Sequence, residues 1–138
     1  MNFQPRYSET ELHQIAEQVG ERVGWDFSTM RTLREPVPWD YITVVRDYLQ
    51  PTDSVVDLGT GGGERLLELQ NDASALLGID LDEEMIGRAR ILAGEKCPSH
   101  VQFEVGTDMN LNREFDVVLN RHAPFDPQVV KELLVDGG

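Results

Sequence analysis

The spacing of hydrophobic residues in the first third of the chain is typical of helices. Between residues 8 and 22, apolar side chains recur every three or four positions, which predicts an amphipathic helix. Ser8 and Glu11 form the pattern of a capping box at its start. A second helix is predicted over residues 40–49, capped by Asp40 at its beginning.

A proline-containing segment separates these two helices. Pro36 and Pro38 exclude regular structure over residues 24–40. Trp39 lies in this segment, and we interpret it as a core anchor in preference to part of a lid over a ligand.

After residue 53 the pattern changes to short apolar runs that alternate with helical segments. Strands are predicted at 54–58, 75–80, 101–105 and 115–120, and helices at 65–70, 85–93 and 127–134. This alternation predicts an α/β fold with a parallel sheet. Residues 106–114, which join the third strand to the fourth, leave room for an extended loop but not for a crossover helix.

Four glycines follow the first strand, in the stretch VVDLGTGGG at residues 55–63. Glycine permits positive φ angles and lets a ligand approach the main chain at a strand-to-helix turn. The stretch is neither a phosphate-binding loop, since no lysine follows, nor a dinucleotide motif, since Glu64 stands where the third glycine belongs. An ordinary glycine-rich surface turn remains the alternative. The failed dinucleotide motif disfavours a nucleotide-dependent oxidoreductase.

The second candidate segment is GIDLD at residues 78–82. Asp80 ends the second strand, where a carboxylate can accept hydrogen bonds from the hydroxyls of a ribose. Asp82 is the predicted cap of the helix that follows.

Together these residues resemble the class I S-adenosylmethionine-dependent methyltransferases of the small bacterial type. VVDLGTGGG is similar to the first motif of that family, and GIDLDEEMIGRAR to the segment after it. VGTDM, FDVVLNRHAPF and LLVDGG (105–109, 115–125 and 133–138) resemble three later segments in the right order. The resemblance covers residues 37–138, which it identifies as the cofactor-binding half of a methyltransferase domain, after an N-terminal helix and cap segment at 1–36.

The resemblance implies a Rossmann-like, mostly parallel sheet with helices on both faces, strand order 3-2-1-4 and two preceding N-terminal helices. It implies S-adenosylmethionine as the cofactor. The implied cofactor-binding residues are Asp57, Gly59, Thr60, Gly61, Gly63, Asp80, Leu81, Asp108, Met109 and Asn120.

The resemblance implies roles for most of these residues. Asp57 and the backbone of residues 59–61 face the methionine portion of the cofactor, while Asp80 holds the ribose and Leu81 flanks the adenine. Asn120, with Arg121 and His122, lies beside the sulfonium and the substrate entrance.

Asp108 and Met109 are implied to hold the adenine. Asp108 accepts a hydrogen bond from the adenine amino group, and Met109 packs on the ring. The alternatives are that Asp108 only stabilises a turn and that Met109 only packs within its loop.

The implied reaction is methyl transfer to a small-molecule acceptor by in-line displacement, for which the protein supplies mainly alignment. His122 is the candidate base where an acceptor must lose a proton, since histidine titrates near neutral pH; a loop histidine without catalytic function is the alternative. No metal site is expected. A non-catalytic subunit or fragment that binds S-adenosylmethionine is the alternative function.

Composition narrows the partners. The chain of 138 residues has 12 basic and 25 acidic side chains and a formal net charge of −13. This charge would repel phosphate backbones and so disfavours binding to nucleic acid. We expect no membrane span, because no apolar stretch is long enough, and no secretory signal, because the first residues lack a basic region followed by an apolar one. Cys97 is the only cysteine, which favours a reducing compartment and a cytoplasmic location. The fourth strand is expected at a sheet edge with the apolar row 117–119, covered by a second copy of the chain or by a missing C-terminal half.

Overall fold

The computed structural model describes residues 6–19, 33, 35–95 and 97–138. The chain forms two compact units, Met1–Glu35 and Pro36–Gly138. The first contains helix α1 (Glu9–Val19). The backbone N–H of Ser8 donates to Oε2 of Glu11 at 2.7 Å, and the N–H of Glu11 donates to Oγ of Ser8 at 3.3 Å, so the predicted capping box forms. The predicted continuation of this helix to residue 22 lies outside the described residues.

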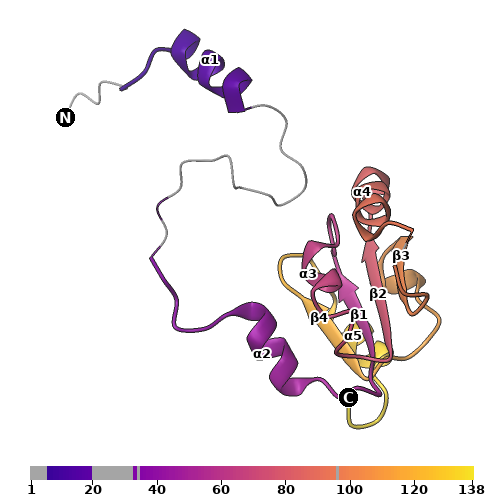
Figure 1. Ribbon diagram of the computed structural model, residues 1–138. Coiled ribbons are helices and arrows are strands. Elements are labelled where there is room, and N and C mark those ends of the chain that lie inside the picture. Colours follow the sequence, from indigo (N-terminus) through magenta and orange to yellow (C-terminus); the bar gives the residue numbers. More distant parts are fainter. Residues whose placement is uncertain (1–5, 20–32, 34, 96) are drawn as a thin grey trace. The chain divides into compact units, whose positions relative to one another are not determined.

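The second unit is built on four parallel strands, β1 (Ser54–Leu58), β2 (Ala75–Asp80), β3 (Val101–Val105) and β4 (Val117–Asn120). Their order in the sheet is β3-β2-β1-β4, so β3 and β4 are the two edges (Figure 1). This confirms the expected Rossmann-like strand order. Val56 of β1 pairs with Leu77 of β2 on one side and with Val118 of β4 on the other.

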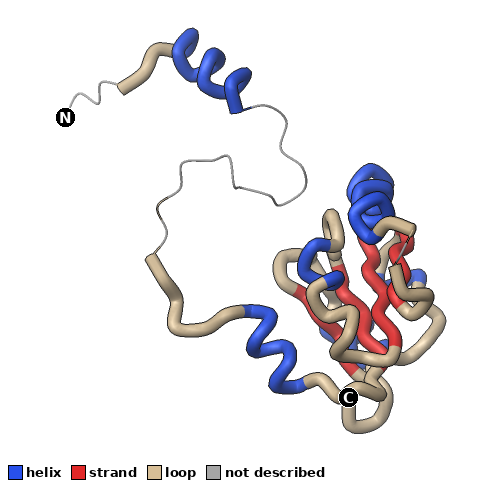
Figure 2. Tube along the Cα trace, in the orientation of Figure 1, coloured by secondary structure: helices blue, strands red, loops and turns tan. Residues whose placement is uncertain are grey.

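Helices alternate with these strands (Figure 2). They are α2 (Tyr41–Tyr48), α3 (Glu64–Leu67), α4 (Glu83–Ala93) and α5 (Pro127–Leu133), with a 3-10 turn η1 (Asp108–Asn110) between β3 and β4. Asp40, Asp82 and Asp126 accept hydrogen bonds from the first turns of α2, α4 and α5, as N-cap residues do. The helix predicted at 65–70 is shorter than expected, because turns with hydrogen bonds to the third preceding residue replace it after Leu67.

Both faces of the sheet are covered, because successive residues of a strand point to opposite faces. One face of the sheet packs with α2, α3 and α4 in an apolar cluster that includes Val55, Leu76 and Ile86. The other face packs with α5 and the loop after β3, around Val56 and Leu77.

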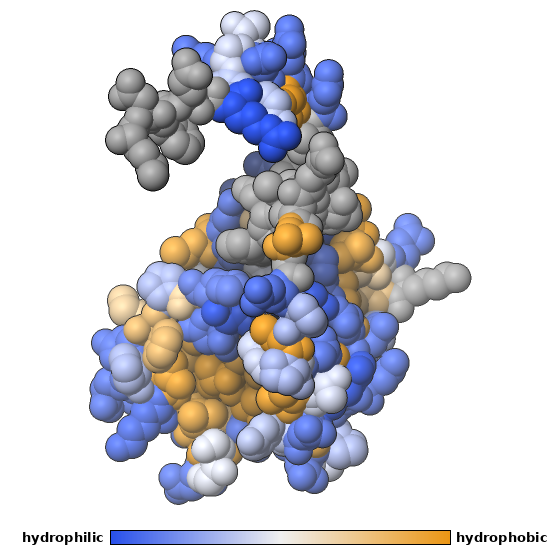
Figure 3. Space-filling view, turned by 90° about the vertical axis from the view of Figure 1, so that its left-hand side faces the viewer, coloured by the Kyte–Doolittle hydropathy of each residue, from blue (hydrophilic) through white to orange (hydrophobic). Residues whose placement is uncertain are grey.

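The β4 edge carries the expected apolar row. Val117 and Val118 are half-buried and Leu119 is buried. Among the described residues no further strand pairs with β4; a single parallel bridge joins Phe115, just before it, to Leu134. Figure 3 shows the face that lies to the left in Figure 1, and on it apolar side chains gather between polar ones.

The interpretation of Trp39 as a core anchor is wrong. This residue is 60% exposed, while the apolar contacts of the adjoining helix are made by Ile42 and Val45. The helical spacing of those two residues, not the size of the tryptophan, determines what reaches the core.

Candidate functional site

The predicted site residues of β1 and β2 lie at the carboxyl ends of these parallel strands. Asp57 is the fourth residue of β1 and pairs in register with Gly78 of β2 and Leu119 of β4. Asp80 is the last residue of β2. In open parallel sheets, ligands bind at the carboxyl ends of the strands, at the point where the connections from neighbouring strands lead to opposite faces of the sheet.

Asp57 is a buried carboxylate, with 7% of its surface exposed. Burial raises its pKa from 3.8 to about 6, against the opposing effects of Thr60 and Arg121. The charge of Asp80 adds to the rise. The Thr60 hydroxyl is also buried and, among the described residues, its oxygen makes no hydrogen bond of regular geometry. The Thr60 side chain lies beside the Asp57 carboxylate and lowers its pKa, so it partly offsets the cost of burying this charge. A carboxylate buried to this extent is typical of functional sites.

The glycine loop between β1 and α3 depends on positive φ angles and close contacts. Gly59 has φ +70°, and a methyl group added to it would lie 2.5 Å from Cβ of Ala123. Gly63 has φ +77°, and an added methyl group would lie 2.7 Å from the ring of Phe103. No side chain fits at either position, so the loop lies directly against the turn after β4 and against β3.

The loop amides are largely used within the protein. The backbone N–H of Thr60 donates to the carbonyl of Ile79 at 2.9 Å, and that of Gly63 to the carbonyl of Thr60 at 3.2 Å. The N–H of Gly61 donates to Oδ2 of Asp80 at 2.9 Å. Phosphate-binding loops need these donors for their ligand, so the geometry disfavours a phosphate cradle.

Asp80 connects three loops. Its Oδ2 accepts from Gly61, its Oδ1 accepts from the N–H of Asp82 at 2.9 Å, and its carbonyl accepts from the N–H of Gly106 at 2.9 Å. The carboxylate therefore faces the glycine loop. Each carboxylate oxygen has a second lone pair, so Asp80 can still accept two hydrogen bonds from a ligand.

Two large apolar side chains follow the carboxyl ends of β2 and β3. Leu81 is 73% exposed and Met109 is 76% exposed. Exposed apolar surface of this kind suits the faces of a planar, apolar ligand. The Oδ1 atom of Asp108 accepts a hydrogen bond from the N–H of Met109 at 3.0 Å, so this carboxylate stabilises its own turn.

The turn after β4 is held by Asn120. Its Nδ2 donates to the carbonyl of Ala123 at 2.9 Å, and its Oδ1 accepts from the N–H of the same residue at 3.1 Å. Both ends of the amide are thus engaged within residues 120–123. His122 lies exposed on this turn.

One contact of this region is not evident from the sequence. The guanidinium carbon of Arg121 lies 4.9 Å from the centre of the Tyr41 ring. Burial, followed by the charge of Asp57, raises the pKa of Tyr41 to about 12, so its hydroxyl stays protonated at neutral pH. The spacing of apolar residues predicts helix α2, but it does not predict that Arg121, far along the chain, contacts Tyr41 at the start of this helix.

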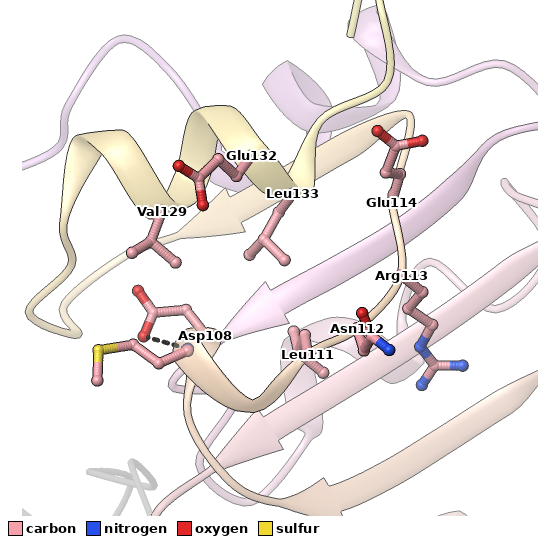
Figure 4. A pocket seen from close by; sticks show the side chains of 9 residues that line it. Asp108, Leu111, Asn112, Arg113, Glu114, Val129, Glu132 and Leu133 are labelled. Carbon is pink, nitrogen blue, oxygen red and sulfur yellow. Dashed lines mark hydrogen bonds between the residues drawn. The ribbon is translucent and has the colours of Figure 1, made fainter.

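A cavity of about 540 Å³ opens between α5 and the loop after β3 (Figure 4). Of the predicted cofactor residues, Asp108 and Met109 line it; the glycine loop and Asp80 do not. Its apolar wall includes Leu111, Val129 and Leu133. The cavity therefore includes the two predicted adenine-binding residues but not the glycine loop or Asp80.

The described residues hold no cluster of three or more histidine, cysteine or acidic side chains that could bind a metal ion. None of the described helices is long and apolar enough to cross a membrane.

Comparison with known proteins identifies a family for most of the Pro36–Gly138 unit. The model of the methyltransferase domain family matches residues 55–135. No curated protein matches the sequence significantly.

Solved structures with a similar fold include the YcgJ protein of Bacillus subtilis, with 26% identity and a TM-score of 0.53 over 58% of this chain and 36% of that one. A complex between the Haloferax volcanii Trm112 methyltransferase activator and a methyltransferase also matches, with 26% identity and a TM-score of 0.54 over 67% of this chain and 44% of that one.

A third similar structure is an S-adenosylmethionine-dependent methyltransferase from Thiobacillus denitrificans, in complex with S-adenosyl-L-homocysteine. It has 20% identity and a TM-score of 0.61 over 80% of this chain and 50% of that one, and it shows likeness of fold alone. The chain spans half or less of the length of each of these three structures.

Proposed function

The chain belongs to the methyltransferase domain family, and from this premise we propose that it binds S-adenosylmethionine and transfers the methyl group to a small-molecule acceptor by in-line displacement. The observation that carries the proposal is the carboxylate of Asp80, which is oriented toward the glycine loop by the N–H of Gly61 and retains free lone pairs.

The residues present fit this cofactor. Asp80 is the proposed acceptor for the two ribose hydroxyls, and Leu81 and Met109 are the proposed apolar contacts of the adenine. Asp57 and the loop from Gly59 are proposed to face the methionine portion, where a buried carboxylate attracts a cationic group. The internally paired amides of the loop suit a ligand without phosphate groups.

When bound, the cofactor supplies a methyl group already activated by its positive sulfur. The protein must then hold the acceptor in line and keep competing water away. His122 is the proposed base for acceptors that lose a proton, because it is exposed on the turn that abuts the glycine loop. Tyr41 is excluded from this role at neutral pH by its raised pKa.

The single cysteine supports our proposal of a cytoplasmic location. A second copy of the chain, or further sequence C-terminal to it, is the proposed cover of the β4 edge. The Haloferax methyltransferase in complex with an activator is a precedent for a partner protein.

Methyl-labelled S-adenosylmethionine tests the proposal. We expect label to appear in a small-molecule acceptor, together with equimolar S-adenosylhomocysteine. Binding of the cofactor without transfer to any of a broad set of acceptors would favour the second candidate, a non-catalytic cofactor-binding subunit or fragment. Binding of NADH in place of S-adenosylmethionine would contradict both.

A further inference from the structure

Arg121 differs from most arginines in the part of the chain that the structure describes. Arg46, Arg65, Arg88 and Arg113 each lie within 4.0 Å of a carboxylate oxygen. Like Arg6 and Arg90, Arg121 makes no ion pair of this kind with any described residue; its charge acts on the buried carboxylate of Asp57, whose pKa it lowers.

The position of Arg121 is set by its neighbours. The side chain of Asn120 bridges to the backbone of Ala123 and fixes the turn, and Ala123 lies against Gly59. The guanidinium group lies over the ring of Tyr41, which is half-buried on α2. A cation–π contact does not use the N–H groups as hydrogen-bond donors, so they remain available for another ligand.

Arg121 also lies on a definite side of the proposed cofactor site. The β1 strand has β2, with Asp80, on one side and β4, which leads into Arg121, on the other. The proposed ribose position and Arg121 are thus separated by the end of β1 and the glycine loop.

We propose that Arg121, supported by Tyr41, binds a carboxylate group of the methyl acceptor and so selects carboxylate-bearing substrates. Guanidinium groups bind these planar anions through paired hydrogen bonds. This inference rests on the proposed function, since it names the substrate class of the same site.

The test compares small hydroxycarboxylates with their uncharged amides, 4-hydroxybenzoate with 4-hydroxybenzamide and salicylate with salicylamide, by ligand-observed NMR on the full chain saturated with S-adenosylhomocysteine. We expect at least one acid to bind about tenfold more tightly than its amide. In Arg121→Gln this preference should fall to roughly twofold or less. Arg65→Gln is the matched control, because Arg65 is also a cation near Tyr41 but is paired with Glu68 at 2.8 Å.

The inference is overturned if no acid is preferred by the wild type, or if the preference persists in Arg121→Gln. It is also overturned if Arg121→Gln weakens S-adenosylhomocysteine about tenfold but leaves methylthioadenosine unchanged, because Arg121 would then hold the carboxylate of the cofactor. If the wild type does not bind S-adenosylhomocysteine, the proposed function fails; the same acid and amide pairs, measured without it, still decide the role of Arg121.

Discussion

At the scale of single residues, the chain keeps a carboxylate where burial disfavours its charge. Asp57 has a pKa of about 6 in the folded protein, compared with 3.8 for an ordinary aspartate. Between these values the folded state binds a proton that the unfolded state does not, so this residue lowers the free energy of unfolding as the pH rises from about 4 to about 6. Keeping such a residue costs stability at neutral pH, which is typical of functional sites.

Asp57→Asn should remove this pH dependence. We expect the free energy of unfolding of the variant, relative to the wild type, to increase from pH 4 to pH 6.5 by up to roughly 3 kcal/mol. Urea unfolding of both proteins at several pH values measures the change. A difference between the two proteins that stays constant with pH would show that Asp57 titrates normally in the folded state.

The residue scale also shows what the sequence could and could not predict about the site. Asp80 and the glycines are found from their position after apolar runs, because strand ends carry the ligand groups of parallel sheets. The stacking of Arg121 on Tyr41 depends on the packing of two segments far apart in the chain, so no local pattern predicts it. The same holds for the internal pairing of the loop amides.

At the scale of elements, the glycine loop is constrained on two sides. Gly59 combines a φ of +70° with a contact to Ala123 that leaves no room for a methyl group. Gly87, in the interior of α4, has nothing within 4 Å of an added methyl group. Substitution by alanine at these two positions should therefore have opposite effects. At Gly87 alanine is favoured as a better helix former, whereas at Gly59 the loop requires glycine.

We expect Gly59→Ala to lower the free energy of unfolding by roughly 2 kcal/mol or more, through the positive φ and the collision with Ala123. Gly87→Ala should raise it by roughly 0.5–1 kcal/mol. Urea unfolding of both variants is the measurement. Equal effects of the two substitutions would mean that the loop can relax away from the turn after β4.

The bounds of most strands could be predicted from the sequence. The bounds of β1, β2 and β3 agree with the predicted strands, because each apolar run is bordered by polar residues or glycine. The fourth strand begins at Val117 and not at residue 115, because Phe115 bonds with Leu133 and Val135 instead, its N–H donating at 2.7 Å and its carbonyl accepting at 3.0 Å. Pairing with a distant segment shortened it, and the local pattern cannot show this.

At the scale of the whole Pro36–Gly138 unit, the sheet ends in an edge with half-buried valines. Edges of this kind pair with other chains. We predict that the chain as given associates as its concentration rises toward about 100 μM, and that Val117→Lys reduces the association. Sedimentation velocity measures it, with circular dichroism to verify folding of the variant. A wild type that stays monomeric at every concentration would refute the prediction.

At the same scale, we propose that the carboxyl ends of the strands form one site for an adenosyl group, with Asp80 as its main contact. Calorimetric titration with S-adenosylhomocysteine tests it most directly, on the wild type, on Asp80→Asn and on the control Asp72→Asn, whose aspartate pairs with Arg46 on the surface. We predict a dissociation constant of about 1–100 μM for the wild type and the control, and binding weakened at least about tenfold in Asp80→Asn. No binding by the wild type, or equal binding by all three proteins, would contradict the account.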